Sequence, residues 1–186
     1  MCEDLFRKGI RRGVNGCYTI PLPKNEDVLS KLGESRDIAF RRLLGTERRL
    51  TRDPNLRNQY VTVMDEYLKL GHMRKVEDDT EEPAKRCYLP HHPVVKEASI
   101  TAKVRVVFDA SCKTLTGISL NYALLVGPVV QENLRSIILR SRTKQIFLVS
   151  DVEKMFRQIL TTPKDRPLLW ILYRFTPQDK VTVYEP

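Results

Sequence analysis

The sequence predicts an α+β protein, with helices in its first half and strands in its second. Apolar residues recur at helical spacing between residues 35 and 76, and they alternate at strand spacing between 103 and 108. Five carboxylates crowd into residues 77–82 between these regions, followed by Pro83, a composition typical of a solvated linker. We therefore expect an extended lead-in at 1–34, a basic helical hairpin at 35–76, an acidic linker at 77–85 and a strand-rich domain at 86–186.

Composition sets the broad class of protein. The chain has 186 residues, 41% of them hydrophobic, and a formal net charge of +9. These values fit one ordinary globular domain, or one domain with an appendage, and exclude a wholly disordered chain. Apolar stretches are too short for a membrane span, and the start lacks the pattern of a secretory signal. The four cysteines lack metal-binding spacing, so we expect free thiols.

The first predicted helix covers residues 35–52. Ala39, Leu43 and Leu50 recur on one face, and many arginines occupy the remainder. This pattern predicts a basic amphipathic helix. Its arginine face could contact phosphates, or it could simply be a solvated helix surface, and the sequence leaves both interpretations open.

A second helix is predicted to begin at Asp53 and Pro54. Asp is a good N-cap and Pro suits the first helical position, while Gly71 provides a helix end. The short connection between the two helices predicts a helical hairpin. The apolar face of the second helix is expected to contain Tyr60, Val63, Met64, Tyr67 and Leu68.

Strand patterns begin after the linker. Segments 94–96 and 103–108 are predicted to form a β-hairpin. Because side chains alternate across a strand, Val104, Val106 and Phe108 should share one face. Lys103, Arg105 and Val107 should share the other.

Further elements are predicted towards the end of the chain. Residues 131–142 show a helical pattern, and the apolar run 146–149 is expected to be a short buried strand ending at Ser150 and Asp151. Segments 168–175 and 181–184 are additional strand candidates.

Two features could carry chemistry. An aspartate at the end of a strand, such as Asp151, is well placed to bind Mg²⁺ in phosphoryl transfer, because carboxylate oxygens suit that ion. Alternatively, Ser150 and Glu153 form a capping box and Asp151 only helps to start a helix. Lys103 and Arg105 could bind phosphates or could line the solvent face of a strand. Phe156 would by default be a core residue.

The order of these features matches a known family. Residues 88–97, 103–111, 117–121, 126–134 and 148–159 read YLPHHPVVKE, KVRVVFDAS, GISLN, VGPVVQENL and LVSDVEKMFRQI. Together they closely resemble the reverse transcriptase of Bel/Pao long-terminal-repeat retrotransposons. The upstream segments ERRL (47–50) and EYLKLGHMRKV (66–76) also resemble the helical region that precedes the polymerase in that family. The resemblance implies a partial right-hand polymerase, consisting of fingers and an incomplete palm, preceded by a helical hairpin.

The resemblance also implies roles for individual residues. Asp151 matches the first catalytic aspartate, which binds both Mg²⁺ ions, and Val152 matches the position whose backbone carbonyl completes the metal site. Lys103 and Arg105 match fingers residues that grip the triphosphate of the incoming dNTP, which suits a point charge and a forked guanidinium.

Three further positions would shape the nucleotide pocket. Phe156 matches the steric gate, an aromatic ring that excludes a ribose 2′-hydroxyl and so favours deoxynucleotides. Lys154 and Met155 would line the pocket beside the 3′-hydroxyl.

One departure from the family bears on activity. Two-metal catalysis needs further carboxylates, which the family supplies as a later Asp-Asp pair, and no such pair follows Asp151. We expect a truncated polyprotein that is inactive alone. Its implied partners are the RNA template, the RNA/DNA hybrid, dNTP and the remaining polyprotein, with no membrane, in cytoplasmic virus-like particles and with a DNA product destined for the nucleus. Two alternatives stay open: a non-catalytic nucleic-acid-binding or interaction module, and a non-functional remnant.

Overall fold

The computed structural model describes residues 2–14, 16–76, 85–95, 104–129, 131–150 and 155–186, with the side chain of Phe156 not described. These residues form helices and strands in the mixture expected of the α+β class. The chain divides into two compact units. The first unit comprises residues 1–23 and 125–161, and the second comprises residues 24–124 and 162–186.

The first unit contains a small sheet with strand order β1-β2-β6. Strands β1 and β2 are antiparallel, whereas β2 and β6 are parallel. Gly16 has a φ of +83° in the β1–β2 turn, a backbone conformation that glycine adopts without a steric cost. The elements are α1 (Cys2–Gly9), β1 (Arg11–Arg12), β2 (Tyr18–Ile20), α6 (Leu134–Ser141), the 3₁₀ helix η1 (Met155–Gln158) and β6 (Ile159–Thr161).

The prediction of an extended lead-in at 1–34 was wrong. Residues 2–9 form α1, because acidic Glu3 and Asp4 lie in its first turn and basic Arg7 and Lys8 in its last, which complements the helix dipole. An ion pair between Arg7 and Glu3, four residues apart, adds to this.

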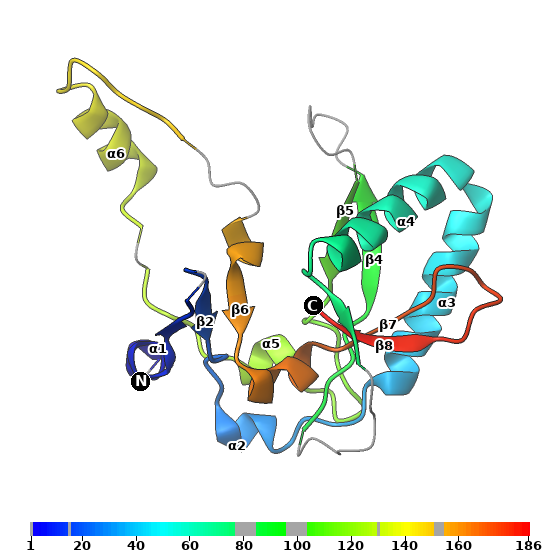
Figure 1. Ribbon diagram of the computed structural model, residues 1–186. Coiled ribbons are helices and arrows are strands. Elements are labelled where there is room, and N and C mark those ends of the chain that lie inside the picture. Colours follow the sequence, from blue (N-terminus) through cyan, green and yellow to red (C-terminus); the bar gives the residue numbers. More distant parts are fainter. Residues whose placement is uncertain (1, 15, 77–84, 96–103, 130, 151–154) are drawn as a thin grey trace. The chain divides into compact units, whose positions relative to one another are not determined.

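The second unit is built on the helical hairpin of α3 (Arg36–Arg52) and α4 (Pro54–Lys69), shown in Figure 1. The predicted starts of both helices are confirmed to within a residue, but the hairpin, predicted to extend to 76, ends at Lys69, and residues 74–75 form the strand β3 (Arg74–Lys75). The Asp53 side chain accepts a hydrogen bond from the Leu56 amide at 2.9 Å, and Gly71 follows the second helix with a φ of +69°.

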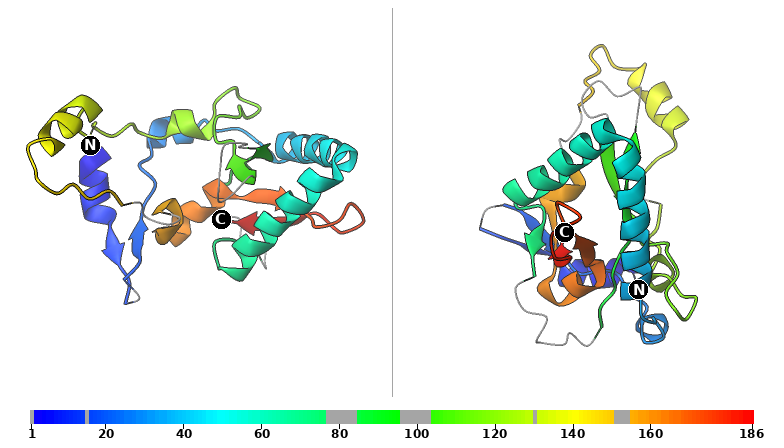
Figure 2. Two further views of the ribbon diagram at one scale, coloured as in Figure 1. Left: turned by 90° about the horizontal axis from the view of Figure 1, so that it is seen from above. Right: turned by 90° about the vertical axis from the view of Figure 1, so that its right-hand side faces the viewer.

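A pair of strands and a three-stranded sheet pack against this helical hairpin. Strands β4 (His91–Val95) and β5 (Val104–Phe108) form an antiparallel pair, as predicted. A second sheet has the order β3-β8-β7. Helix α4 contacts β5, and α3 contacts both β4 and β7, so the helices lie against both structures (Figure 2). The other elements of this unit are α2 (Glu26–Leu29), β3 (Arg74–Lys75), α5 (Leu120–Ala123), η2 (Pro163–Leu169), β7 (Ile171–Tyr173) and β8 (Thr182–Glu185).

The core of the second unit joins the helical hairpin to the strands that follow the acidic segment. Ala39 and Leu43 of α3 pack with Tyr88, Trp170 and Leu172 in one buried cluster. The helical hairpin and the strands therefore share a core, whereas the sequence predicted an acidic linker at 77–85 that separates two domains. Residues 77–84 lie outside the described part of the chain.

Candidate functional site

The β4–β5 hairpin carries Arg105 and is the best-defined part of the predicted site. Val94 lies opposite Arg105, and His91 lies opposite Phe108. Val104 is buried, whereas Arg105 and Val107 are exposed, so the predicted alternation of faces is confirmed for the described residues. Arg105 thus projects from the face of the strand opposite to the one that packs on the core.

Aromatic packing fixes the inner face of this hairpin. The Phe108 ring lies 6.4 Å from the Tyr67 ring of α4 and 6.1 Å from the His91 ring, measured between centroids. Such aromatic pairs contribute about 0.5–1.5 kcal/mol each beyond their buried area. The strand that presents Arg105 therefore packs against α4.

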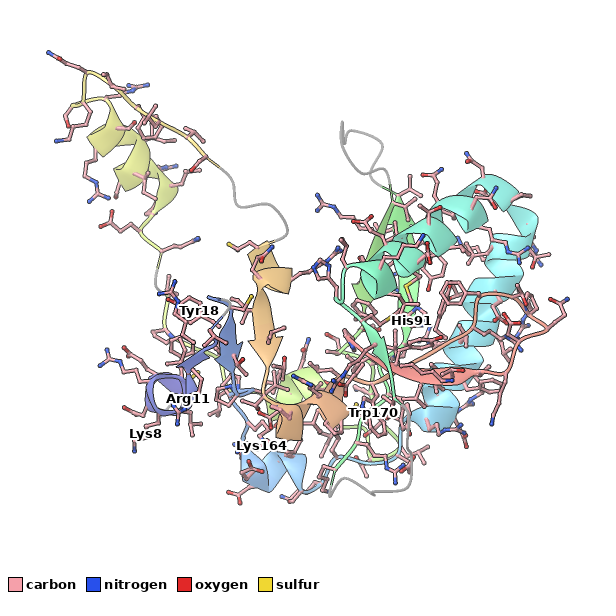
Figure 3. The ribbon with its side chains drawn as sticks, viewed as in Figure 1. Lys8, Arg11, Tyr18, His91, Lys164 and Trp170 are labelled. Carbon is pink, nitrogen blue, oxygen red and sulfur yellow. The ribbon has the colours of Figure 1, made fainter. Side chains whose placement is uncertain are left out.

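His91, labelled in Figure 3, lies on β4. It is buried, with 3% of its surface exposed, and both of its ring nitrogens are hydrogen-bonded. Nε2 lies 2.9 Å from the Leu172 carbonyl oxygen, which can only accept, so Nε2 carries the proton. Nδ1 then accepts a hydrogen bond from the Tyr60 hydroxyl. This histidine ties β4 to α4 and to β7 at once.

Burial lowers the pKa of His91 to about 4, although its bond to the Leu172 carbonyl acts in the opposite direction. The side chain is therefore neutral at physiological pH. A neutral histidine with both nitrogens engaged within the fold has no free lone pair for a metal or a proton transfer. We interpret its role as structural, and sequence reasoning missed it because its partners lie 31 and 81 residues away.

A buried carboxylate lies in η2 of the second unit. Asp165, with 0% exposure, accepts hydrogen bonds from Lys24 Nζ at 2.7 Å and Thr162 Oγ1 at 2.6 Å. Burial lowers the pKa of Lys24, but the hydrogen bond and charge of Asp165 outweigh that effect and raise it. The pair anchors η2 to the segment before α2.

A small cavity lies between α3, α4 and the segment after β7. Glu47 and Arg174 line it and form a bidentate ion pair, with both nitrogen–oxygen distances at 2.7 Å. Tyr173 also lines it, and the buried Tyr173 hydroxyl has no hydrogen-bond partner among the described residues. The cavity volume is about 30 Å³, which suits a single water molecule and is far too small for a nucleotide.

The remaining predicted site residues are only partly described. Lys103, Asp151, Val152 and Lys154 lie outside the described residues, as does most of the alternative capping box at 150–153. Met155 begins η1 and is 46% exposed, and Phe156 follows it in the same 3₁₀ helix. These two belong to the first unit, whereas Arg105 belongs to the second.

The prediction of a buried strand at 146–149 was wrong. The segment forms no strand, and its side chains are exposed, with Leu148 at 87% and Val149 at 83%. An apolar run forms a buried strand only when neighbouring strands pair with it, and the described residues provide no such partner for this segment. The helix predicted at 131–142 does form, as α6, but it buries none of its residues.

Among the described residues, no group of three or more His, Cys, Asp or Glu side chains is arranged to hold a metal ion. The cysteines Cys2, Cys17, Cys87 and Cys112 are free thiols. Within the same ranges, no helix is long and apolar enough to cross a membrane. No protein-family model matches the chain, and no curated protein matches it either.

Proposed function

We propose that this chain is the fingers and early palm segment of an RNA-directed DNA polymerase from a Bel/Pao-type retrotransposon polyprotein. The observation that carries the proposal is the hairpin of β4 and β5. It contains two of the segments that resemble that family, and it presents Arg105 on an exposed face while the opposite face packs on a rigid core.

In this proposal Lys103 and Arg105 bind the triphosphate of a deoxynucleotide. An arginine suits the task because its guanidinium donates two parallel hydrogen bonds to phosphate oxygens. The core side of the hairpin holds the strand in place, so that the backbone carrying Arg105 does not have to be ordered at the moment of binding.

The metal would be held by Asp151 and the Val152 carbonyl. Mg²⁺ bound there would activate the primer 3′-hydroxyl and neutralise charge on the phosphates. Phe156 would exclude the ribose 2′-hydroxyl, and Lys154 and Met155 would line the pocket. Because a two-metal site needs more carboxylates than Asp151, we expect no primer extension by this chain alone.

Binding of Mg²⁺–dATP to the chain tests the proposal. A charge-assisted hydrogen bond contributes about 1.5–3 kcal/mol, so Arg105→Ala should weaken binding about 10- to 100-fold. Arg36→Ala is the matched control, because Arg36 is an exposed arginine of the same unit that lies outside the hairpin. Equal affinities for the Arg105→Ala and Arg36→Ala variants would contradict the assignment.

A second candidate function is a nucleic-acid-binding module without catalysis. The net charge of +9 and the exposed arginines of α3 favour it. Its affinity for nucleic acid should fall steeply as salt rises from about 50 to 200 mM, because binding releases counterions. A flat affinity across that range would exclude it.

A further inference from the structure

The outer face of α3 concentrates positive charge around a glycine. Arg41, Arg42, Arg48 and Arg49 lie at positions −4, −3, +3 and +4 from Gly45. In an α-helix these four positions are the nearest surface neighbours of the central residue, with Cβ atoms about 5–6 Å apart. The Cβ atoms of the four arginines therefore surround a point on the helix that has no side chain.

This face is free to meet a partner. All four arginines and Gly45 are exposed, while Ala39, Leu43 and Leu50 bury the opposite side of the helix. Arg41 and Arg48 each donate from Nε to a backbone carbonyl four residues earlier, at 3.3 Å. Among the described residues, none of the four arginines forms an ion pair.

Gly45 has no explanation in packing. A Cβ atom added there would meet nothing within 4 Å, and the position lies in the middle of a 17-residue helix. Glycine in a helix interior costs about 1 kcal/mol relative to alanine. A glycine that the fold does not need, surrounded by cations, is suited to the close approach of a polyanion to the helix backbone.

We propose that this arginine face, centred on Gly45, binds the phosphate backbone of a nucleic acid. The partner follows from charge complementarity, since guanidinium groups pair with phosphate oxygens through two parallel hydrogen bonds. The four arginines span nine residues, with about 12 Å of helix rise between the first and the last, which is comparable to several phosphate spacings of about 3.4 Å along a strand. The contacts are to phosphates, so they confer affinity without sequence preference.

The inference rests on the second candidate function, nucleic-acid binding, and not on the polymerase assignment. Its experiment measures the affinity of the full chain for a short RNA/DNA hybrid and for a DNA duplex of the same sequence, between about 50 and 200 mM salt. The test variant carries Arg41→Gln, Arg42→Gln, Arg48→Gln and Arg49→Gln. Glutamine keeps a high helix propensity, so α3 should still form.

The control variant removes the same number of charges elsewhere in the second unit. It carries Lys31→Gln, Arg36→Gln, Lys113→Gln and Lys180→Gln, all at exposed positions. Because each phosphate contact contributes about 0.9 to the slope of log affinity against log salt, the test variant should lose about 3 to 4 in slope and bind about 100-fold more weakly. The control should change far less.

A third variant, Gly45→Leu, adds a side chain at the centre of the face without changing its charge. It should weaken binding several-fold while leaving the helix at least as stable, because leucine has the higher helix propensity. Unchanged binding by Gly45→Leu would contradict a close approach at Gly45. Equal losses in the test and control variants would overturn the proposal while leaving nucleic-acid binding intact.

Absence of any nucleic-acid binding by the unchanged chain would overturn both the inference and the second candidate function. Vesicles containing phosphatidylserine provide the remaining comparison. Binding to such vesicles that depends on the four arginines, with no dependence of hybrid or duplex binding on them, would assign the face to a membrane surface and contradict the proposal.

Discussion

The two units of this chain use apolar residues in opposite ways. In the second unit Leu172 and Trp170 are buried in a cluster that joins α3 to β7. In the first unit the apolar residues Ile146, Leu148 and Leu139 are largely exposed. The comparison shows that apolar content does not itself produce a core, because a core needs elements that pack on each other from distant parts of the sequence.

The two units also differ in their buried polar groups. The second unit satisfies His91 and Asp165 with partners far along the sequence, which is possible only where several elements converge. Exposed apolar surface of the kind seen in the first unit is typical of interaction sites and of aggregation. We therefore expect substitutions to have large effects in the second unit and small effects in the first.

The largest effect should come from Lys24→Met, which removes the cation that donates a hydrogen bond to the buried Asp165 carboxylate. Removing one member of a buried ion pair costs about 3–5 kcal/mol in the free energy of unfolding. Trp170, the single tryptophan of the chain, lies in the second-unit core, so its fluorescence during urea unfolding reports on this unit. Lys164→Met, at an exposed position of η2, is the control. Equal urea midpoints for Lys24→Met and Lys164→Met would show that the Lys24–Asp165 pair does not stabilise the second unit.

The next largest effect should be a pH dependence of the free energy of unfolding that arises from His91. Its pKa is about 4 in the folded protein, against an ordinary value of 6.5, so the unfolded chain binds more protons between these values. Stability should therefore be complete above pH 6.5 and fall as the pH drops towards 4, by up to about 3 kcal/mol.

Urea unfolding of Trp170 at pH 7 and pH 4.5 measures this loss. A His91→Gln variant should be less stable at pH 7 but should lose less stability between the two values, because its side chain does not titrate. If both proteins lost the same stability, the contribution of His91 would be refuted.

A smaller effect is expected for Tyr60→Phe. This change removes the hydroxyl that donates to His91 Nδ1 and leaves a buried acceptor without a partner, at a cost of about 1–3 kcal/mol. Tyr122→Phe removes a hydroxyl from an exposed tyrosine and should leave the unfolding midpoint unchanged. If the unfolding midpoint of Tyr60→Phe were also unchanged, the hydrogen bond to His91 would not contribute to stability.

The smallest effect should follow from Ile146→Ser combined with Leu148→Ser in the first unit. Both side chains are exposed, so the free energy of unfolding should change by no more than about 0.5 kcal/mol. Thermal unfolding followed by far-ultraviolet circular dichroism measures this change. Leu172→Ser, in the core of the second unit, is the contrasting variant and should be strongly destabilised. Similar losses in the two proteins would contradict the difference between the units.

Local signals in the sequence predicted the helical hairpin well. Asp53 and Pro54 define the start of α4 through a cap and a fixed backbone angle, and both effects act within a few residues. The alternation along β5 likewise follows from strand geometry alone. The charges that begin and end α1 were equally local, and they could have predicted that helix.

The failures concern information that is not local. The run at 146–149 is apolar, but its burial depends on partners that its own residues do not specify. Asp165 is buried because Lys24 reaches it across 141 residues of sequence. Of the predicted site, Arg105 lies on the strand and the exposed face that were predicted, while the roles given to Arg105, Lys103 and Asp151 stay predictions.

Primer extension tests the polymerase assignment most directly. The chain would be joined to a downstream Bel/Pao reverse-transcriptase segment that carries an adjacent pair of aspartates, and assayed with Mg²⁺, dNTPs and an RNA template with a DNA primer. We predict extension by the joined protein and its loss, by at least about 1,000-fold, when Asp151 is changed to Asn, because the two-metal site loses a ligand. Extension that is unchanged by Asp151→Asn, or absent from the joined protein, would contradict the assignment.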